Sequence, residues 1–300
     1  MIIDSHGHLG NILYPGGGEL IFRKGVKKRF VIDIATLSEW QLHAGMPPAL
    51  YRLLLDPITR GERARNETAT LENLRKSMNR AGVDRMVCLP VPPHVTFEDL
   101  RRAADLDAGL IPFTAVDFTR RYDFQAALRA DVAAGARGLK LHPIIQKEPL
   151  DSKRTFEMVE AFAVHGLPVL FHSGVSSYYL DAEKTRNQEM SYGEIRYARD
   201  LVAAFPRVNF IAGHAGMFQV DDVMALLGGS SNVYVDVTFQ SPAKITRLIK
   251  VFGPERVLYG SDWPWGNHIP AIKAVRKACR GDRALEDVIF HKNAARLLKL

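Results

Sequence analysis

The sequence has little cysteine and no long apolar run. Its two cysteines, Cys88 and Cys279, lie far apart and belong to no Cys-x-x-Cys pair, so we expect buried, reduced thiols in a cytoplasmic protein rather than a disulfide framework or a redox centre. No stretch of about 18 uninterrupted apolar residues occurs, and the first residues, MIIDSHGHLG, lack the basic and apolar regions of a signal peptide. The sequence therefore predicts neither export nor a membrane partner.

Glycine-rich phosphate-binding motifs are also absent. Neither GxGxxG nor GxxxxGK[ST] occurs, and the glycines at 16–18 follow no convincing strand, which counts against a doubly wound nucleotide-binding sheet. A Gly-x-Ser-x-Gly motif is missing as well, so the sequence does not indicate a hydrolase built on a serine nucleophile.

Charge of one sign is in slight excess. Forty Lys and Arg residues against 33 Asp and Glu residues give a net charge of +7, but much of the excess stands in one short basic patch. A nucleic-acid groove needs basic residues spread along it with aromatics between them, so we expect no nucleic-acid partner. The basic patch is either a solvated loop or a surface that attracts an anionic substrate. It consists of Arg23, Lys24, Lys27, Lys28 and Arg29.

Eight short apolar runs alternate with segments that carry apolar residues at helical spacing. Several runs are almost wholly apolar, as is typical of parallel strands covered by helices. Eight such units predict an α/β fold, a closed (β/α)8 TIM barrel, with a doubly wound open sheet as the alternative. The expected strands are MIID (1–4), RMVCLP (85–90), IPFTAV (111–116), RGLKLH (137–142), PVLFH (168–172), VNFIAG (208–213), VYVDV (233–237) and RVLYGS (256–261).

Residues 9–66 interrupt this pattern after the first strand. They are far longer than an ordinary βα loop, and SEWQLHAG (38–45) and PPALYRLLLD (47–56) are typical of short helices. A connection that leaves the carboxyl end of a barrel strand lies on the active-site face. We therefore expect a single domain, 1–300, in which 9–66 form an inserted lid above the site.

Five of the ten histidines stand at or just past the ends of expected strands, and an aspartate follows the last strand. His6 and His8 are two residues apart, so in an extended strand their side chains project to the same side. Imidazoles with one carboxylate suit Zn²⁺, and also Mn²⁺, Fe²⁺ or Co²⁺. One such histidine alone is more often a buried structural residue, but the whole group indicates a metal site. The group is His6, His8, His142, His172, His214 and Asp262.

The segments DSHGHLG, FHSG, GHAG, YGSDWP and HKNAARLLKL together resemble the amidohydrolase superfamily, specifically the amidohydrolase-related (amidohydrolase 2) family. The resemblance spans the first strand to the last helix and implies a divalent metal at the mouth of a barrel. It implies that His6, His8, His172 and Asp262 bind the metal. His214 would transfer protons and share that role with Asp262, as a histidine near neutral pKa can. We expect one ion rather than two, most readily zinc.

Lys140 and His142 are expected to face the barrel interior, because side chains alternate along a strand. Binuclear members of the superfamily use a carboxylated lysine on the fourth strand, and Lys140 resembles that position. The alternative is a cation paired with a substrate carboxylate or with Asp117. Many single-metal relatives that act as decarboxylases lack this lysine. We predict that Lys140 and His142 bind substrate.

The sequence thus predicts a metal-dependent hydrolase that uses a metal-activated water on a small-molecule amide, lactone or ester-like bond. The alternative is a metal-dependent non-oxidative decarboxylase of a small aromatic carboxylic acid. The substrate is expected to be anionic, and a homo-oligomer is compatible with the sequence. Lesser candidates for the pocket are Trp263, Trp265, His94, Asp117 and Asp236, whereas His43, His165, His268 and His291 are expected to be structural or on the surface.

Overall fold

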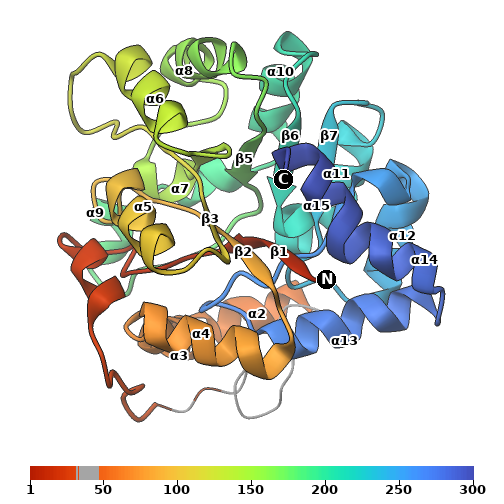
Figure 1. The fold of residues 1–300 in the computed structure, drawn as a ribbon, viewed down its shortest axis with the longest axis horizontal. Helices are drawn as coiled ribbons and strands as arrows, with labels where there is room; N and C mark the ends of the chain where they lie inside the picture. The colour runs from red at the N-terminus through yellow and green to blue at the C-terminus, as the bar shows by residue number, and fades with distance from the viewer. Residues whose placement is uncertain (32, 34–46) are drawn as a thin grey trace.

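Eight short parallel strands form the centre of the computed structural model, which describes residues 1–31, 33 and 47–300 (Figure 1). Each strand falls within or overlaps one of the eight expected runs, so the prediction of the strands is confirmed. They are β1 (Ile3–Gly7), β2 (Arg85–Cys88), β3 (Leu110–Pro112), β4 (Leu139–Leu141), β5 (Val169–His172), β6 (Phe210–Gly213), β7 (Val233–Asp236) and β8 (Val257–Leu258).

The strands close into a barrel. Regular pairing joins β1 to β3 in one set and β4 to β8 in another. Between β3 and β4, the Thr114 amide donates to the carbonyl of Gly138 at 2.9 Å. Between β8 and β1, Gly7 pairs with Trp263, and the amide of His8 donates to the Trp263 carbonyl at 2.7 Å. These contacts confirm the closed (β/α)8 architecture.

Side chains alternate between the inside and the outside of the barrel. Leu170 and Ile211 belong to an inner apolar cluster, whereas Val169 and Phe171 pack with the helix residues outside. Leu297, in the last helix, also joins the inner cluster. The inner apolar layer is therefore continuous with the C-terminal helix, and the polar inward positions of the same strands are left for a site.

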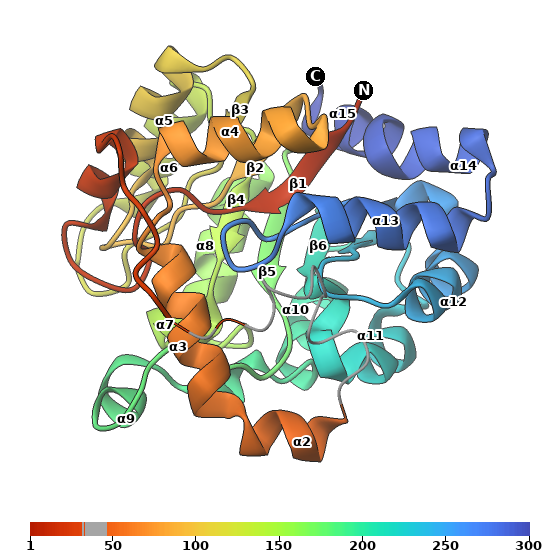
Figure 2. The same cartoon turned by 90° about the horizontal axis from the view of Figure 1, so that it is seen from below.

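Helices cover the outside of the barrel (Figures 1 and 2). Their starts are set locally: Thr96 and Asp99 form a capping box at the start of α5, and the Thr70 side chain accepts from the Asn73 amide at the start of α4. Among the described residues, no helix is long and apolar enough to cross a membrane. The helices are α4 (Leu71–Ala81), α5 (Phe97–Leu106), α6 (Phe124–Ala133), α7 (Pro143–Gln146), α8 (Lys153–Ala163), α9 (Glu183–Asn187), α10 (Arg196–Ala204), α11 (Val220–Leu227), α12 (Pro242–Phe252), α13 (His268–Cys279), α14 (Arg283–Asp287) and α15 (Asn293–Leu298).

The described part of 9–66 contains a short 3-10 helix (Gly17–Phe22) and two α-helices, α2 (Pro48–Leu53) and α3 (Leu55–Asn66). Helix α2 confirms the helix expected within 47–56, whereas the one expected at 38–45 lies outside the described residues. Helix α3 was not expected as a separate element. Arg65, in its last turn, donates from Nε to the carbonyl of Pro264 at 3.1 Å and from Nη2 to that of Trp265 at 2.7 Å. Helix α3 therefore holds the loop that follows β8.

We expect Arg65→Ala to lower the free energy of unfolding by about 3 kcal/mol, because it removes two hydrogen bonds from a charged donor and leaves Asp33 buried without this partner. Thermal denaturation would measure the loss, and limited proteolysis would show cleavage near Trp265. Arg60→Ala, an exposed residue of the same helix, is the matched control and should change stability by less than about 0.5 kcal/mol. Equal effects of the two substitutions would contradict the anchoring role of Arg65.

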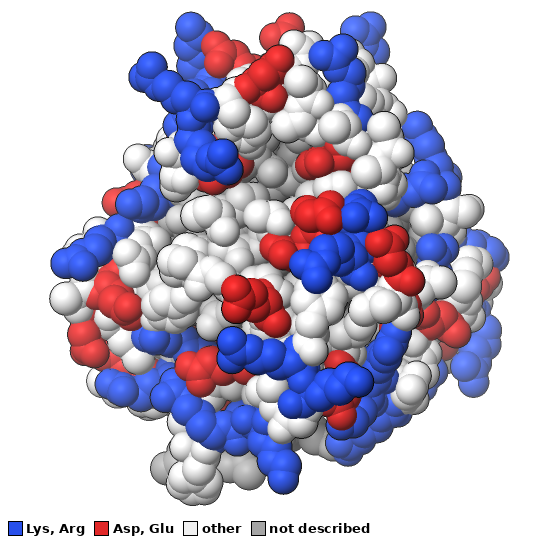
Figure 3. Space-filling view, turned by 60° about the vertical axis from the view of Figure 1, so that its left-hand side comes forward, with Lys and Arg blue, Asp and Glu red and all other residues white. Residues whose placement is uncertain are grey.

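The basic patch is partly neutralised. Lys28 Nζ lies 2.9 Å from Asp33 Oδ2, and Arg29 Nε lies 2.9 Å from Glu67 Oε2. The more exposed Arg23 approaches Glu19 at 3.9 Å. Figure 3 shows basic and acidic residues interspersed on the visible face rather than a continuous basic surface. This pattern favours the solvated loop over a strong attractor of polyanions.

Candidate metal centre

His6, His8 and Asp262 meet at the carboxyl end of the barrel. His6 lies in β1, His8 directly follows it, and Asp262 follows β8. The Nε2 atoms of His6 and His8 lie 3.6 Å and 3.5 Å from Asp262 Oδ1. All three residues are buried, and one ligand atom from each lies within 4.8 Å of the others. The structure therefore brings together three of the four residues for which the resemblance implied metal binding.

Both imidazoles are oriented by their other ring nitrogen. His6 Nδ1 is 2.8 Å from Asp236 Oδ2, and His8 Nδ1 is 2.8 Å from the carbonyl of Leu89. Asp236 Oδ2 also accepts from the backbone amide of His214 at 3.0 Å. A carboxylate or carbonyl behind a metal-binding histidine fixes its tautomer and turns the free nitrogen toward the ion. The sequence indicates Asp236 only as a lesser candidate for the pocket, and no motif predicts this orienting role.

We expect Asp236→Asn to weaken metal binding by about tenfold to a hundredfold, because an amide fixes the His6 tautomer less strongly than a carboxylate. Competition with a chelator would measure the affinity. Asp117→Asn is a suitable control, since Asp117 is also a buried aspartate, in the segment that follows β3. In the described chain its carboxylate accepts hydrogen bonds from Thr119 alone. Equal affinities of the Asp236 variant and the parent protein would contradict the orienting role.

Four buried polar atoms around this centre have no hydrogen-bond partner within the described residues. They are His6 Nε2, His214 Nδ1, Asp262 Oδ1 and Lys140 Nζ. Buried polar atoms are nearly always satisfied. The His6 nitrogen and the Asp262 oxygen are ligand atoms that suit a divalent transition ion, and the Nε2 atom of His8 converges on them. The donor set therefore fits an ion held by His6, His8 and Asp262.

His214 and Asp262 are held in an unusual backbone conformation beside one another. His214 has a φ of 61° and Asp262 a φ of 55°, which is the left-handed region that residues other than glycine seldom adopt. The amide of Asp262 donates to the carbonyl of His6 at 2.7 Å. His214 Nδ1 lies 3.9 Å from Asp262 Oδ2. The backbone thus presents both side chains to the centre, with their nearest polar atoms just beyond direct hydrogen-bond distance of each other.

His172 is also buried at the end of its strand, but both of its ring nitrogens meet protein atoms. Nε2 lies 2.9 Å from the carbonyl of Gly174, and Nδ1 lies 3.3 Å from the hydroxyl of Tyr178. The ring stacks on His142 with centroids 4.5 Å apart. Among the described residues, His172 belongs to no cluster of side chains with converging ligand atoms. Its role as a metal ligand stays a prediction. Tyr178 was not anticipated, since no motif marks it.

Lys140 supplies a buried positive charge. Burial lowers the pKa of its ammonium group to about 8, although Asp262 and Asp236 oppose the shift. The group therefore remains mostly protonated at pH 7. Burial, together with the charge of Lys140, also holds the pKa values of His6 and His8 well below their usual range. These imidazoles are neutral, as a metal ligand must be. Lys140 Nζ has no hydrogen-bond partner in the described chain. The alternative pairing of Lys140 with Asp117 is therefore not formed there.

In the described chain, Trp265 and the remaining histidine candidates lie outside the groups of converging ligand atoms. Trp265 meets the ring of Tyr178 edge-on at 5.4 Å. His268 contacts Asp4 and Ser77 inside the protein, and His291 contacts Asp287, in agreement with structural or surface roles. His43 lies outside the described residues.

A pocket of about 250 Å³ opens on one side of the barrel mouth. It is lined by the segments that follow β1 to β5, and His94, Gln146 and Tyr179 contribute polar groups. The Gln146 side chain accepts from the amide of His142 at 2.9 Å. His94 therefore lines the mouth as expected, and this pocket adjoins the segment that carries His142.

Comparison with known proteins agrees with this architecture. The model of a family described as Amidohydrolase matches residues 3–300. No curated protein matches the chain. An uncharacterised TIM-barrel protein of Bordetella bronchiseptica is 18% identical, with a TM-score of 0.67, over 99% of this chain and 98% of that one.

Two further solved structures have named activities. A probable 2-pyrone-4,6-dicarboxylic acid hydrolase of Acinetobacter baumannii, with citric acid bound, is 13% identical, with a TM-score of 0.60, over 100% and 99% of the two chains. A 5-carboxyvanillate decarboxylase of Novosphingobium aromaticivorans, complexed with manganese and 4-hydroxy-3-methoxy-5-nitrobenzoic acid, is 16% identical, with a TM-score of 0.64, over 100% and 96%. At these identities the likeness shows the barrel fold.

Proposed function

Because the chain belongs to the amidohydrolase family, we propose that it is a metal-dependent hydrolase of a small-molecule amide, lactone or ester-like bond. One divalent ion is held by His6, His8 and Asp262, with His172 as a fourth ligand after its ring reorients. The donors suit zinc, and also manganese, iron or cobalt. The observation that carries this proposal is the buried ammonium of Lys140, which has no hydrogen-bond partner in the described chain.

The position of Lys140 favours hydrolysis for an electrostatic reason. During attack on a carbonyl, negative charge develops on its oxygen, and a fixed cation in a dry site stabilises that charge most in the transition state. During decarboxylation, the carboxylate loses its charge as CO₂ departs. A cation fixed beside that carboxylate would stabilise the ground state and raise the barrier.

Proton transfer is assigned to His214 and Asp262. A bound divalent ion supplies Lewis acidity and makes a water more acidic. The free Oδ2 of Asp262 would take a proton from the attacking water, and His214, whose pKa is held well below its usual range by burial, would relay that same proton to the leaving group. His142, stacked on His172, contacts the substrate.

We further propose that 9–66 form a lid on a single domain, since Arg65 ties α3 to the loop that follows Asp262.

A second candidate is non-oxidative decarboxylation of a small aromatic acid. The manganese-containing decarboxylase similar to this chain favours it. In that reaction Lys140 would stabilise charge on a neighbouring substrate oxygen instead of the departing carboxylate. The same two residues would then place a proton on the ring.

The deciding experiment is a panel of lactones, amides and hydroxylated aromatic acids, tested with the zinc and the manganese forms. Ring opening or amide cleavage without CO₂ supports the hydrolase. Release of CO₂ from an aromatic acid, without any hydrolysis, would replace that proposal by the second candidate.

A further inference from the structure

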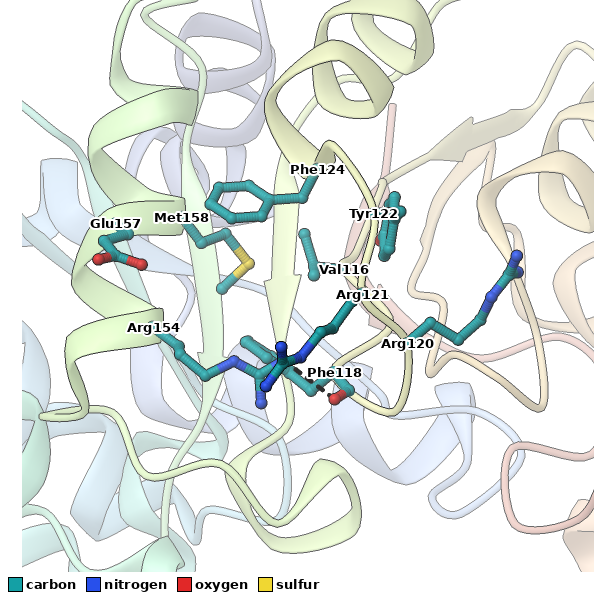
Figure 4. Close-up of a pocket in the computed structure, with 9 residues that line it drawn as sticks. All are labelled: Val116, Phe118, Arg120, Arg121, Tyr122, Phe124, Arg154, Glu157 and Met158. Atoms are coloured by element: carbon teal, nitrogen blue, oxygen red, sulfur yellow. Dashed lines mark hydrogen bonds between the residues drawn. The ribbon is translucent and has the colours of Figure 1, made fainter.

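A second pocket, of about 170 Å³, lies between the segment after β3 and helix α8 (Figure 4). Its apolar wall consists of Val116, Phe118, Phe124 and Met158, with Tyr122 beside them. Val116 and Met158 are buried, so the floor of this pocket belongs to the packed core. Aliphatic and aromatic side chains together make a surface for a flat apolar group.

Positive charge gathers at the opening of the same pocket. Arg121 and Arg154 extend from opposite walls toward its centre, whereas Arg120 points away from them (Figure 4). The guanidinium group of Arg154 already has two protein partners: Nη1 lies 3.1 Å from Glu148 Oε2, and Nη2 donates to the Phe118 carbonyl at 3.0 Å. The side chain of Arg121 has no carboxylate partner among the described residues.

Glu157 is the acidic residue in the lining, and it lies 3.6 Å from Lys153 Nζ. The pocket is therefore positively charged overall. Arg121 and Arg154 extend toward the same part of the pocket (Figure 4), where a bound anion would offset the repulsion between their charges. Guanidinium groups also match the planar geometry of a carboxylate through paired hydrogen bonds.

We propose that this pocket is an accessory binding site for a small organic anion with a flat apolar body and a carboxylate. The apolar body packs against Phe124 and Met158, and the carboxylate binds Arg121 and Arg154. The site differs from the metal centre, since it contains none of the histidines or aspartates gathered there.

Phe118 connects this anion pocket to the pocket at the barrel mouth. Its side chain lines both pockets, and the guanidinium carbon of Arg154 lies 4.9 Å from the centre of its ring. An anion that engages Arg154 therefore acts on a residue that also shapes the mouth.

The test uses the metal-loaded protein, residues 1–300, and 4-fluorobenzoate, observed by fluorine NMR. The metal centre also attracts anions. Binding of the probe is therefore measured both in the metal-loaded protein and after removal of the metal. Arg121→Gln should raise the Kd of the accessory site by about tenfold or more, because it removes a charged hydrogen-bond donor. Arg121→Lys, which keeps the charge and loses the planar fork, should weaken binding less.

Two controls separate recognition from general charge. Arg129→Gln removes a charge from an exposed position of α6 outside the pocket lining and should leave the Kd within about twofold. The neutral probe 4-fluorobenzyl alcohol should bind at least about tenfold more weakly than the carboxylate. An unchanged Kd in Arg121→Gln, or equal affinity for the alcohol, would overturn the accessory site. Neither outcome bears on the proposed hydrolysis, which is measured separately by product formation.

Discussion

Alanine at both His6 and His8 should reduce the metal content of the purified protein from the expected one ion per chain to nearly none. The two substitutions remove two of the three ligand atoms that converge within 4.8 Å. Since a bound ion lowers the activation free energy of hydrolysis by several kcal/mol, its loss should reduce activity by about a thousandfold or more. Elemental analysis measures the ion directly and needs no knowledge of the substrate.

The barrel should remain folded in this double variant. Its apolar layers are made by other inward positions, such as Leu170 and Ile211, and removal of buried polar groups leaves them in place. His291→Ala, at a partly exposed histidine of the last turns, is the matched control for general loss of imidazole. Unchanged metal content in the double variant, with an intact circular dichroism spectrum, would disprove the proposed ligand assignment.

The barrel could be predicted because its signal is local and repeated. Each strand carries its own alternation, so the inward orientation of Lys140 follows from Leu139 and Leu141 on either side. The same rule placed His6 and His8 on one side of the first strand. Eight such local signals are enough for the architecture, since parallel strands joined by helices close in only a few ways.

The interactions that orient the site could not be predicted in the same way. Asp236 reaches His6 only because barrel closure leaves β8 alone between β7 and β1, and Leu89 reaches His8 only through the register of β2 beside β1. These contacts depend on side-chain rotamers and on registers set by the whole barrel. The direction of the His172 ring has the same origin: its neighbours Gly174 and Tyr178 lie on a loop whose conformation no local pattern determines.

The inserted segment was the least predictable part. Its length and place after the first strand suggested a lid, yet helix α3 and its anchoring residue, Arg65, carried no recognisable motif. Arg65 becomes informative only when the carbonyls of Pro264 and Trp265 are seen beside it. The basic patch likewise has a weaker positive charge than the sequence suggests, because Lys28 and Arg29 lie beside carboxylates.

Lys140→Met should lower kcat/KM by about a hundredfold to a thousandfold while leaving the bound metal in place. Methionine has a similar shape but no charge, so the variant loses electrostatic stabilisation in a dry site, where one such group contributes about 3 to 4 kcal/mol. Steady-state kinetics on the substrate found in the panel would measure this loss. If the charge acts on the transition state, the decrease falls mainly on kcat rather than on KM.

The same substitution should stabilise the folded protein. The ammonium of Lys140 is fully buried and has no hydrogen-bond partner in the described chain, so it costs free energy that an apolar side chain of similar volume does not. We expect a rise of about 1 to 3 kcal/mol in the free energy of unfolding, seen as a higher Tm. A carboxylated lysine that bridges two ions predicts the opposite: the metal content would fall and stability would decrease. A stabilised, metal-loaded and nearly inactive variant would therefore identify Lys140 as a charge retained for the reaction at the expense of stability.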